Sequence, residues 1–223
     1  MNLTLFLATT IVPLLFGLWA QMKVKRTFAK YSQVQPRNGM TGAEAAAAVL
    51  RSSGLPQLSI RPVAGRLSDH YDPRNRTLNL SEDVGAASSL AALGVAAHEA
   101  GHAVQDARNY TPMRIRQALV PAATIGQSLW FLPVFLGLIM GLTGLVTIGL
   151  ILFAVIVLFQ LVTLPVEFDA SKRALVALEG QGLLAPDEVP GARAVLNAAA
   201  LTYIAGFVAA LGQLIYFFAL SRQ

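Results

Sequence analysis

Long apolar segments alternate with polar ones along this chain. The run "LTLFLATTIVPLLFGLWA" (Leu3–Ala20) carries no charge, and the 50 residues from Gln117 to Val166 contain no charged residue and no histidine. A last apolar run extends from about Val195 to Leu220. A membrane-spanning helix needs about 20 apolar residues, so the middle run accommodates two spans with a turn near "GLTG". The pattern predicts a mainly α membrane protein with about four transmembrane helices.

The polar segments show shorter elements. In "TGAEAAAAVLRSSGLP", Thr41 and Glu44 have the spacing of a capping box, which predicts a short helix. The stretch "LSIRPVAGRLSDHYDPRNRTLNLS" alternates apolar and polar residues on both sides of "DPRN", a sequence that favours a turn. It predicts a small β-hairpin with its second strand near Arg76 to Ser81. The alanine-rich run from about Ala86 to Ala107 predicts a second helix.

Composition supports membrane insertion. Hydrophobic residues make up 55% of the chain and charged residues only 13%, which is too apolar for an ordinary soluble domain. The lipid bilayer is therefore an expected partner. The net charge of +5 does not indicate nucleic-acid binding, because no basic stripe with interleaved aromatic residues occurs. The chain has no cysteine, so a bound metal would need His, Asp or Glu ligands.

The distribution of charge predicts the orientation in the membrane. The segment from Gln21 to Gln117 holds 13 of the 17 basic residues but 7 of the 12 acidic ones, and it begins "QMKVKRTFAK". The positive-inside rule places this segment in the cytoplasm. The first apolar run could be a signal peptide, but its charges follow it instead of preceding it, which favours a retained anchor. A hairpin of two spans returns the chain to the side it left, so Glu167 should emerge in the same compartment as this segment.

The stretch "AAHEAGHAVQ" contains two of the three histidines. Residues four apart share one face of a helix, so His98 and His102 can bind one metal ion. Glu99 is rotated by about 100° from His98 and can hold a water molecule at the metal. H-E-x-x-H on a helix is the arrangement of metalloproteases, with the glutamate as general base. The alternative is a buried, hydrogen-bonded pair of histidines without a metal.

A catalytic zinc site normally has three protein ligands. The candidates for the third ligand are Glu167, Asp169, His70 and Asp106. Asp106 lies on the same helical stripe as His102, where it could orient that histidine or face water. Glu167 is preferred because the membrane hairpin returns it to the compartment of the histidines. Its alternative role is a carboxylate in the first turn of a helix, which the helix dipole favours.

Several motifs together resemble a known family. "HEAGHAVQ", then "LPVEFDASKRAL" after the hairpin, "AALTYIA" in the last span and "DHYDP" upstream resemble the YugP-type membrane neutral zinc metallopeptidases. These are similar in plan to the HtpX-type and CAAX-prenyl endopeptidases, and the likeness covers nearly the whole chain.

The resemblance implies a gluzincin, with one Zn²⁺ per chain held by His98, His102 and Glu167 and with Glu99 as the catalytic acid and base. One position departs from the wider group. Ser171 stands where that group has an aspartate, and Asp169 is an acid nearby. On a regular helix Glu167 and Ser171 share a face, whereas Asp169 points away.

Two upstream residues are further candidates. His70 or Tyr71 could donate a hydrogen bond to the oxyanion of a tetrahedral intermediate. The alternative for His70 is a turn histidine with a backbone partner. A peptide substrate is expected to lie extended along the strand from Arg76 to Ser81, because pairing with a sheet edge demands no particular sequence.

These observations predict five segments: an N-terminal transmembrane anchor (1–20), a cytoplasmic catalytic segment with the H-E-x-x-H helix (21–117), a transmembrane hairpin (118–165), a cytoplasmic segment with the third zinc ligand (166–194) and a C-terminal transmembrane helix (195–223). The cytoplasmic parts are expected to form a zincin-like domain. The predicted function is a zinc endopeptidase of the bacterial cell (inner) membrane, with its active site facing the cytoplasm. Its expected substrates are peptides or membrane proteins, in processing or quality control. The alternative is a catalytically inactive membrane scaffold or adaptor that retains the zinc site.

Overall fold

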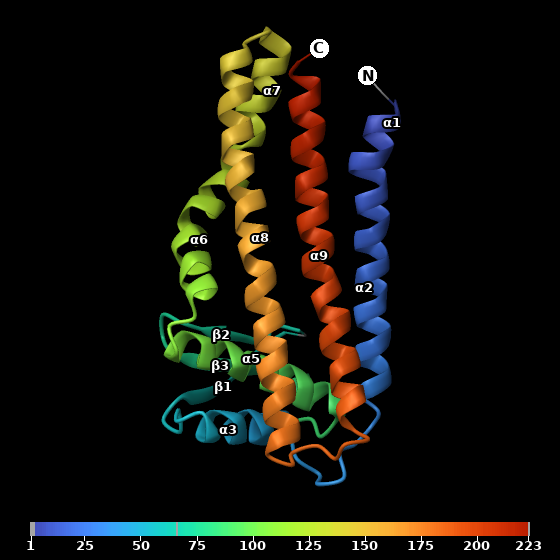
Figure 1. The fold of residues 1–223 in the computed structure, drawn as a ribbon, viewed down its shortest axis with the longest axis vertical. Helices are drawn as coiled ribbons and strands as arrows, with labels where there is room; N and C mark the ends of the chain where they lie inside the picture. Colours follow the sequence, from blue (N-terminus) through green and yellow to red (C-terminus); the bar gives the residue numbers. More distant parts are fainter. Residues whose placement is uncertain (1–2, 66, 223) are drawn as a thin grey trace. The chain divides into compact units, whose positions relative to one another are not determined.

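The computed structural model describes residues 3–65 and 67–222, and most of them are helical (Figure 1). The helices and strands, in chain order, are α1 (Leu3–Phe6), the π-helical turn η1 (Leu7–Ile11), α2 (Val12–Tyr31), α3 (Gly42–Ser52), β1 (Ser59–Val63), β2 (His70–Asp72), β3 (Thr77–Ser81), α4 (Glu82–Gly85), α5 (Leu90–Ala107), α6 (Thr111–Leu129), α7 (Phe131–Met140), α8 (Thr143–Gly180) and α9 (Val189–Leu220).

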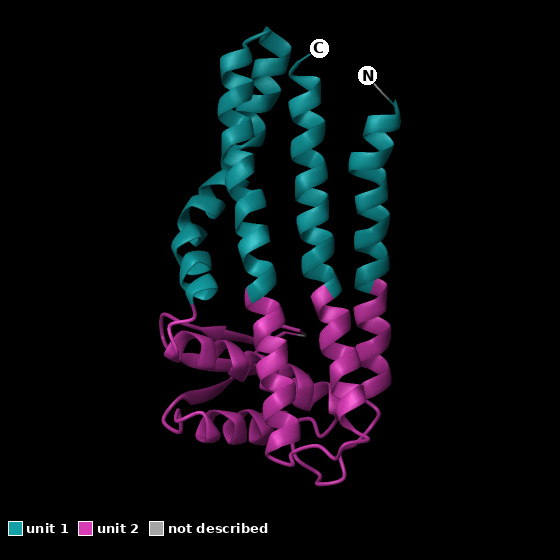
Figure 2. Ribbon diagram, in the orientation of Figure 1, with its two compact units in different colours: residues 1–21, 111–165, 201–223 teal, residues 22–110, 166–200 magenta. Residues whose placement is uncertain are grey.

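The chain forms two compact units (Figure 2). The first contains residues 1–21, 111–165 and 201–223, and the second contains residues 22–110 and 166–200. Helices α2, α8 and α9 contribute residues to both units.

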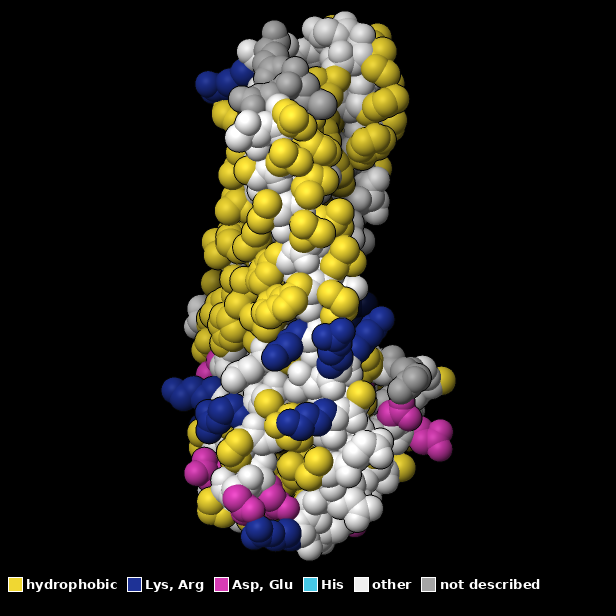
Figure 3. Space-filling model, turned by 90° about the vertical axis from the view of Figure 1, so that its right-hand side faces the viewer, with side chains coloured by type: hydrophobic (Ala, Val, Ile, Leu, Met, Phe, Trp, Pro, Cys, Tyr) yellow, Lys and Arg dark blue, Asp and Glu magenta, His cyan; other side chains and the backbone are white. Residues whose placement is uncertain are grey.

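Four helical segments are long and apolar enough to cross a membrane: Leu3–Tyr31, Thr111–Met140, Thr143–Gly180 and Val189–Leu220. Hydrophobic side chains dominate the face of the first unit that Figure 3 shows. An exposed hydrophobic surface of this extent suits contact with lipid. The predicted mainly α fold with about four transmembrane helices is therefore confirmed, whereas the cytoplasmic location of the polar segments stays a prediction.

Glycines allow close helix packing in the first unit. A Cβ at Gly126 of α6 would lie 2.8 Å from the carbonyl oxygen of Leu152 in α8. A Cβ at Gly149 of α8 would lie 2.7 Å from the carbonyl oxygen of Trp130. Gly141 follows α7 with φ of +67°, in the left-handed region that glycine adopts readily, and so makes the turn into α8. The predicted turn at "GLTG" is confirmed.

The second unit contains a three-stranded sheet with the order β1-β3-β2. β2 and β3 are antiparallel on either side of the "DPRN" turn, whereas β1 pairs with β3 in parallel. The predicted hairpin exists, but β3 is the central strand. The expectation that a substrate lies along Arg76 to Ser81 is wrong, because β1 and β2 already occupy both edges of β3. Alternation of apolar and polar residues along the sequence indicates an extended strand, but it does not show which other strands pair with it.

Helix α5 occupies the centre of the second unit and carries both histidines of the motif. It begins at Leu90 and not at Ala86, because the side chain of Ser89 accepts a hydrogen bond from the N–H of Ala92 and caps the helix. Its neighbours include α3, β2 and β3. The predicted capping box of α3 is present, with Thr41 and Glu44 bonded reciprocally.

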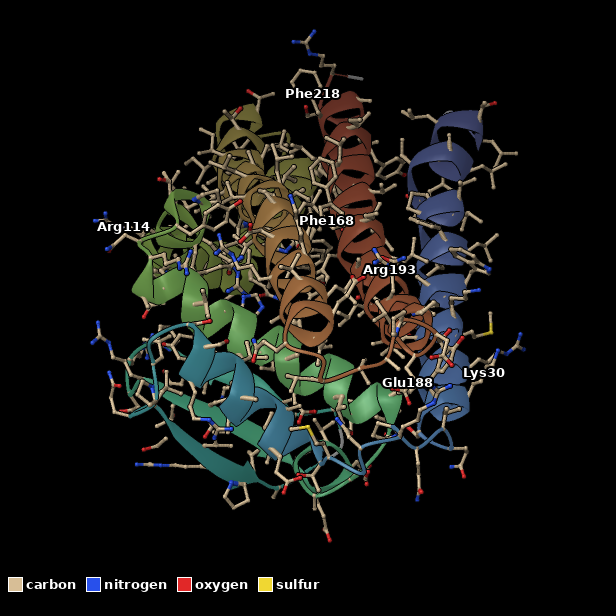
Figure 4. All side chains as sticks on the ribbon, turned by 60° about the horizontal axis from the view of Figure 1, so that its bottom comes forward. Lys30, Arg114, Phe168, Glu188, Arg193 and Phe218 are labelled. Atoms are coloured by element: carbon tan, nitrogen blue, oxygen red, sulfur yellow. The ribbon has the colours of Figure 1, made fainter. Side chains whose placement is uncertain are left out.

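Small residues let α5 approach two long helices. A Cβ at Gly101 would lie 2.7 Å from the carbonyl oxygen of Ala170 in α8, so only glycine fits at this contact. A Cβ at Gly94 would meet Ala192 of α9 at 3.4 Å, an ordinary contact distance. At the start of α9, the buried carboxylate of Glu188 (Figure 4) accepts a hydrogen bond from the backbone N–H of Arg37. The contact at Gly101 holds the histidine-bearing helix against α8, and the contact at Gly94 holds it against α9.

Candidate metal centre

His98 and His102 of α5 converge with Glu167 of α8, and one ligand atom from each lies within 4.8 Å of the others. Oε2 of Glu167 is 3.2 Å from Nε2 of His98 and 3.5 Å from Nε2 of His102. All three residues are buried. The histidines come from consecutive turns of one helix and the glutamate from another, so the group exists only because α5 and α8 pack closely.

The geometry and chemistry of this group fit a zinc ion. Ligand atoms about 2.0–2.1 Å from a tetrahedral zinc are about 3.3 Å from one another, close to both measured distances. Two imidazole nitrogens with one carboxylate oxygen form a known catalytic zinc ligand set. The carboxylate of Glu167 is only 3% exposed, and burial of a charge is costly unless it is paired or coordinates a metal. This carboxylate pairs with the two histidines.

The second nitrogen of each imidazole ring has a partner of its own. Nδ1 of His98 lies 3.1 Å from Oγ of Ser171, and Nδ1 of His102 lies 3.0 Å from Oε1 of Gln105. A proton on each Nδ1 would be donated to these oxygens, which leaves each Nε2 unprotonated and able to bind a metal. Ser171 therefore supports His98 from the position where the resemblance implies an aspartate.

Gln105 is the important residue that the sequence analysis missed. It is completely buried, and its Nε2 donates to the carbonyl oxygen of Val166 at 2.7 Å and to Oδ2 of Asp169 at 2.8 Å. Arg173 also donates to Asp169. Gln105 thus connects His102 to the segment of α8 that carries Glu167. The available signal was a polar residue three positions after His102 on an alanine-rich helix.

Glu99 lies beside the metal-binding group without belonging to it. Its Oε2 accepts a hydrogen bond of 3.2 Å from the backbone N–H of Tyr71 in β2. Burial raises the pKa of Glu99 above its ordinary value. A carboxylate with a raised pKa binds a proton more strongly, which suits a general base.

The remaining candidates have other partners. The hydroxyl of Tyr71 donates to Oδ2 of Asp106 at 2.9 Å. Nδ1 of His102 has Gln105 as its partner, so Gln105 takes the orienting role that was considered for Asp106. Burial and the hydrogen bond to Asp106 raise the pKa of Tyr71, which keeps its hydroxyl protonated. His70 is exposed, and its Nδ1 lies 2.8 Å from the carbonyl oxygen of Ser68. The backbone partner of the predicted alternative is therefore present, but His70 is the first residue of strand β2 and does not lie in a turn.

The sequence matches the protein family described as "Putative neutral zinc metallopeptidase" over residues 6–222. The chain belongs to this family. A relative from Bacillus subtilis (strain 168), named "Putative membrane protease YugP", is 42% identical over 213 residues, which cover 96% of this chain and 95% of the relative. No solved structure shows a significant match. The resemblance to the YugP-type metallopeptidases is thus confirmed, and membership of this family implies zinc.

Proposed function

We propose that this protein is a membrane-bound zinc endopeptidase. The observation that carries the proposal is the convergence of Glu167 with His98 and His102 around a position that suits zinc, with Glu99 beside it. Membership of a zinc metallopeptidase family supports the same chemistry. Four apolar helices support a location in the membrane.

In this proposal different residues of the chain have different roles in peptide hydrolysis. When bound, zinc acts as a Lewis acid and lowers the pKa of a coordinated water to about 7. Glu99 accepts a proton from the attacking water and then donates it to the nitrogen of the leaving amine. The N–H of Tyr71 holds the Glu99 carboxylate in place before substrate arrives. Ser171 and Gln105 keep the two imidazole rings oriented.

The edge of the sheet suggests where a peptide binds. β2 is an edge strand, and its Tyr71 N–H is directed to Glu99 and not to β3. The N–H and C=O of one residue in a strand point to the same side, so the outer edge of β2 faces Glu99, which already accepts from the Tyr71 N–H. We therefore place an extended substrate along β2, in place of the strand predicted from the sequence.

The setting of the reaction is also part of the proposal. The basic residues of Gln21 to Gln117 favour an active site that faces the cytoplasm of a bacterial cell (inner) membrane. Peptides or membrane proteins are then the substrates, in processing or quality control. The inactive scaffold with a retained zinc site remains the competing function.

The test compares the purified full-length protein with Glu99→Gln, using Glu179→Gln as a matched control because Glu179 is an exposed glutamate of α8. Bound zinc is measured by elemental analysis, and cleavage of an unfolded protein by mass spectrometry. We expect all three proteins to bind zinc and only Glu99→Gln to lose cleavage, by at least about 100-fold. Cleavage by Glu99→Gln at the rate of wild type would refute the role of Glu99. Zinc binding without cleavage by wild type would favour the scaffold.

A further inference from the structure

A pocket of about 270 Å³ lies against the C-terminal half of α5, where Ala103, Asp106 and Ala107 line it. It is bounded by α5, by Tyr71 of β2, by Arg76 in the turn that follows, and by the segment between α3 and β1. The lining residues are Leu55, Gln57, Leu58, Tyr71, Arg76, Ala103, Asp106 and Ala107. None of them belongs to the proposed zinc ligands.

The helical repeat connects this pocket to Glu99. Residues at i, i+4, i+7 and i+8 share one face of a helix, so Glu99, Ala103, Asp106 and Ala107 form one stripe of α5. Four residues of helix rise about 6 Å, so the pocket begins about one turn from Glu99. Tyr71 covers the same stripe, because its N–H binds Glu99 and its hydroxyl binds Asp106.

The size and lining of the pocket indicate its ligand. Pockets for whole small-molecule ligands range from about 300 to 1,000 Å³, so this one suits a single side chain. Leu55, Leu58 and two alanines make its walls largely apolar. Arg76 and Asp106 place opposite charges in the wall of the pocket, so the pocket does not favour a substrate side chain of either charge.

We propose that this pocket is a specificity subsite that receives a large apolar side chain, aliphatic or aromatic, from the residue that directly flanks the scissile bond. Consecutive Cα atoms of a peptide are about 3.8 Å apart, so a residue next to the reacting carbonyl reaches a pocket about one helical turn from Glu99. The assignment rests on the proposed function, and it adds a preference that the zinc site alone does not provide.

Two substitutions change the size of the pocket in opposite directions. Ala107 is exposed at its rim, so Ala107→Phe should fill it without disturbing the core, and Leu58→Ala should enlarge it. The matched control is Ala86→Phe, since Ala86 is also an exposed alanine and lines a different pocket, beside β1 and α4.

The first measurement maps the sites at which the zinc-loaded full-length proteins cut an unfolded protein. Wild type and Ala86→Phe should cut beside Leu, Phe or Met. Ala107→Phe should lose this preference for large over small side chains by about 10-fold or more, and Leu58→Ala should favour the largest side chains. Cleavage with no preference, or an unchanged preference in both pocket variants, would overturn the subsite while leaving the peptidase intact.

The second measurement needs no cleavage. Two peptides that differ only by Leu or Ala beside the central bond are titrated against Glu99→Gln, with and without Ala107→Phe. We expect the Leu peptide to bind about 10-fold more tightly to Glu99→Gln and the difference to vanish in the double variant. Equal binding of both peptides to Glu99→Gln would refute the subsite. A binding preference in the absence of any cleavage by wild type would support the subsite and refute the peptidase.

Discussion

Replacement of Gln105 tests whether this residue holds the metal centre together. Gln105→Leu keeps a side chain of similar size but removes a hydrogen bond to His102, one to Val166 and one to Asp169. Each is worth about 1 kcal/mol net, so the free energy of unfolding should fall by about 2 to 4 kcal/mol. Partners that orient a ligating histidine also contribute to affinity, so zinc should bind about 10- to 100-fold more weakly.

A second variant separates the two roles of Gln105. Gln105→Glu keeps an oxygen that can accept from Nδ1 of His102, but it replaces the amide that donates to Val166 and brings a negative charge beside Asp169. It should therefore be as unstable as Gln105→Leu and yet bind zinc more tightly than that variant does.

The assays are zinc competition with a fluorescent chelator and chemical unfolding of the metal-free proteins. The matched control is Gln181→Leu, because the amide of Gln181 donates to Ser52 at an exposed position. That variant should behave as wild type in both assays. If Gln105→Leu binds zinc within threefold of wild type and unfolds at the same denaturant concentration as Gln181→Leu, Gln105 does not hold the metal centre together.

Three further outcomes are expected. Gly101→Ala places a methyl group 2.7 Å from a backbone carbonyl oxygen of α8, so it should destabilise the protein by about 1 to 3 kcal/mol and weaken zinc binding. The control is Gly17→Ala, whose methyl group meets nothing within 4 Å. Thermal unfolding distinguishes the two variants. Ser171→Ala should weaken zinc binding about 10-fold and Ser171→Asp should strengthen it, because a carboxylate is the better acceptor for an imidazole N–H; zinc competition shows the order. Removal of zinc by a chelator should lower the melting temperature of wild type but not of Glu167→Gln, and an equal shift in both would exclude Glu167 as a ligand.

The sequence by itself determined the features that depend on local order along the chain. Apolar runs of spanning length predicted the membrane helices because a bilayer requires about 20 apolar residues in succession. The spacing of His98 and His102 predicted their convergence, because a helix places residues four apart on one face. The "DPRN" stretch predicted the turn between β2 and β3, because its residues favour turn conformations.

The tertiary structure alone decided the features that depend on contacts between distant segments. The parallel pairing of β1 with β3 made β3 the central strand and left β1 and β2 at the edges of the sheet. Because α5 packs closely on α8 at Gly101, the side chain of Gln105 can donate to Val166 and Asp169. The same packing places Oγ of Ser171 within hydrogen-bond distance of His98. Hydrophobic periodicity gives the face of an element that is buried but not the partner that buries it. That partner is selected by shape and by satisfaction of buried polar groups across the whole unit.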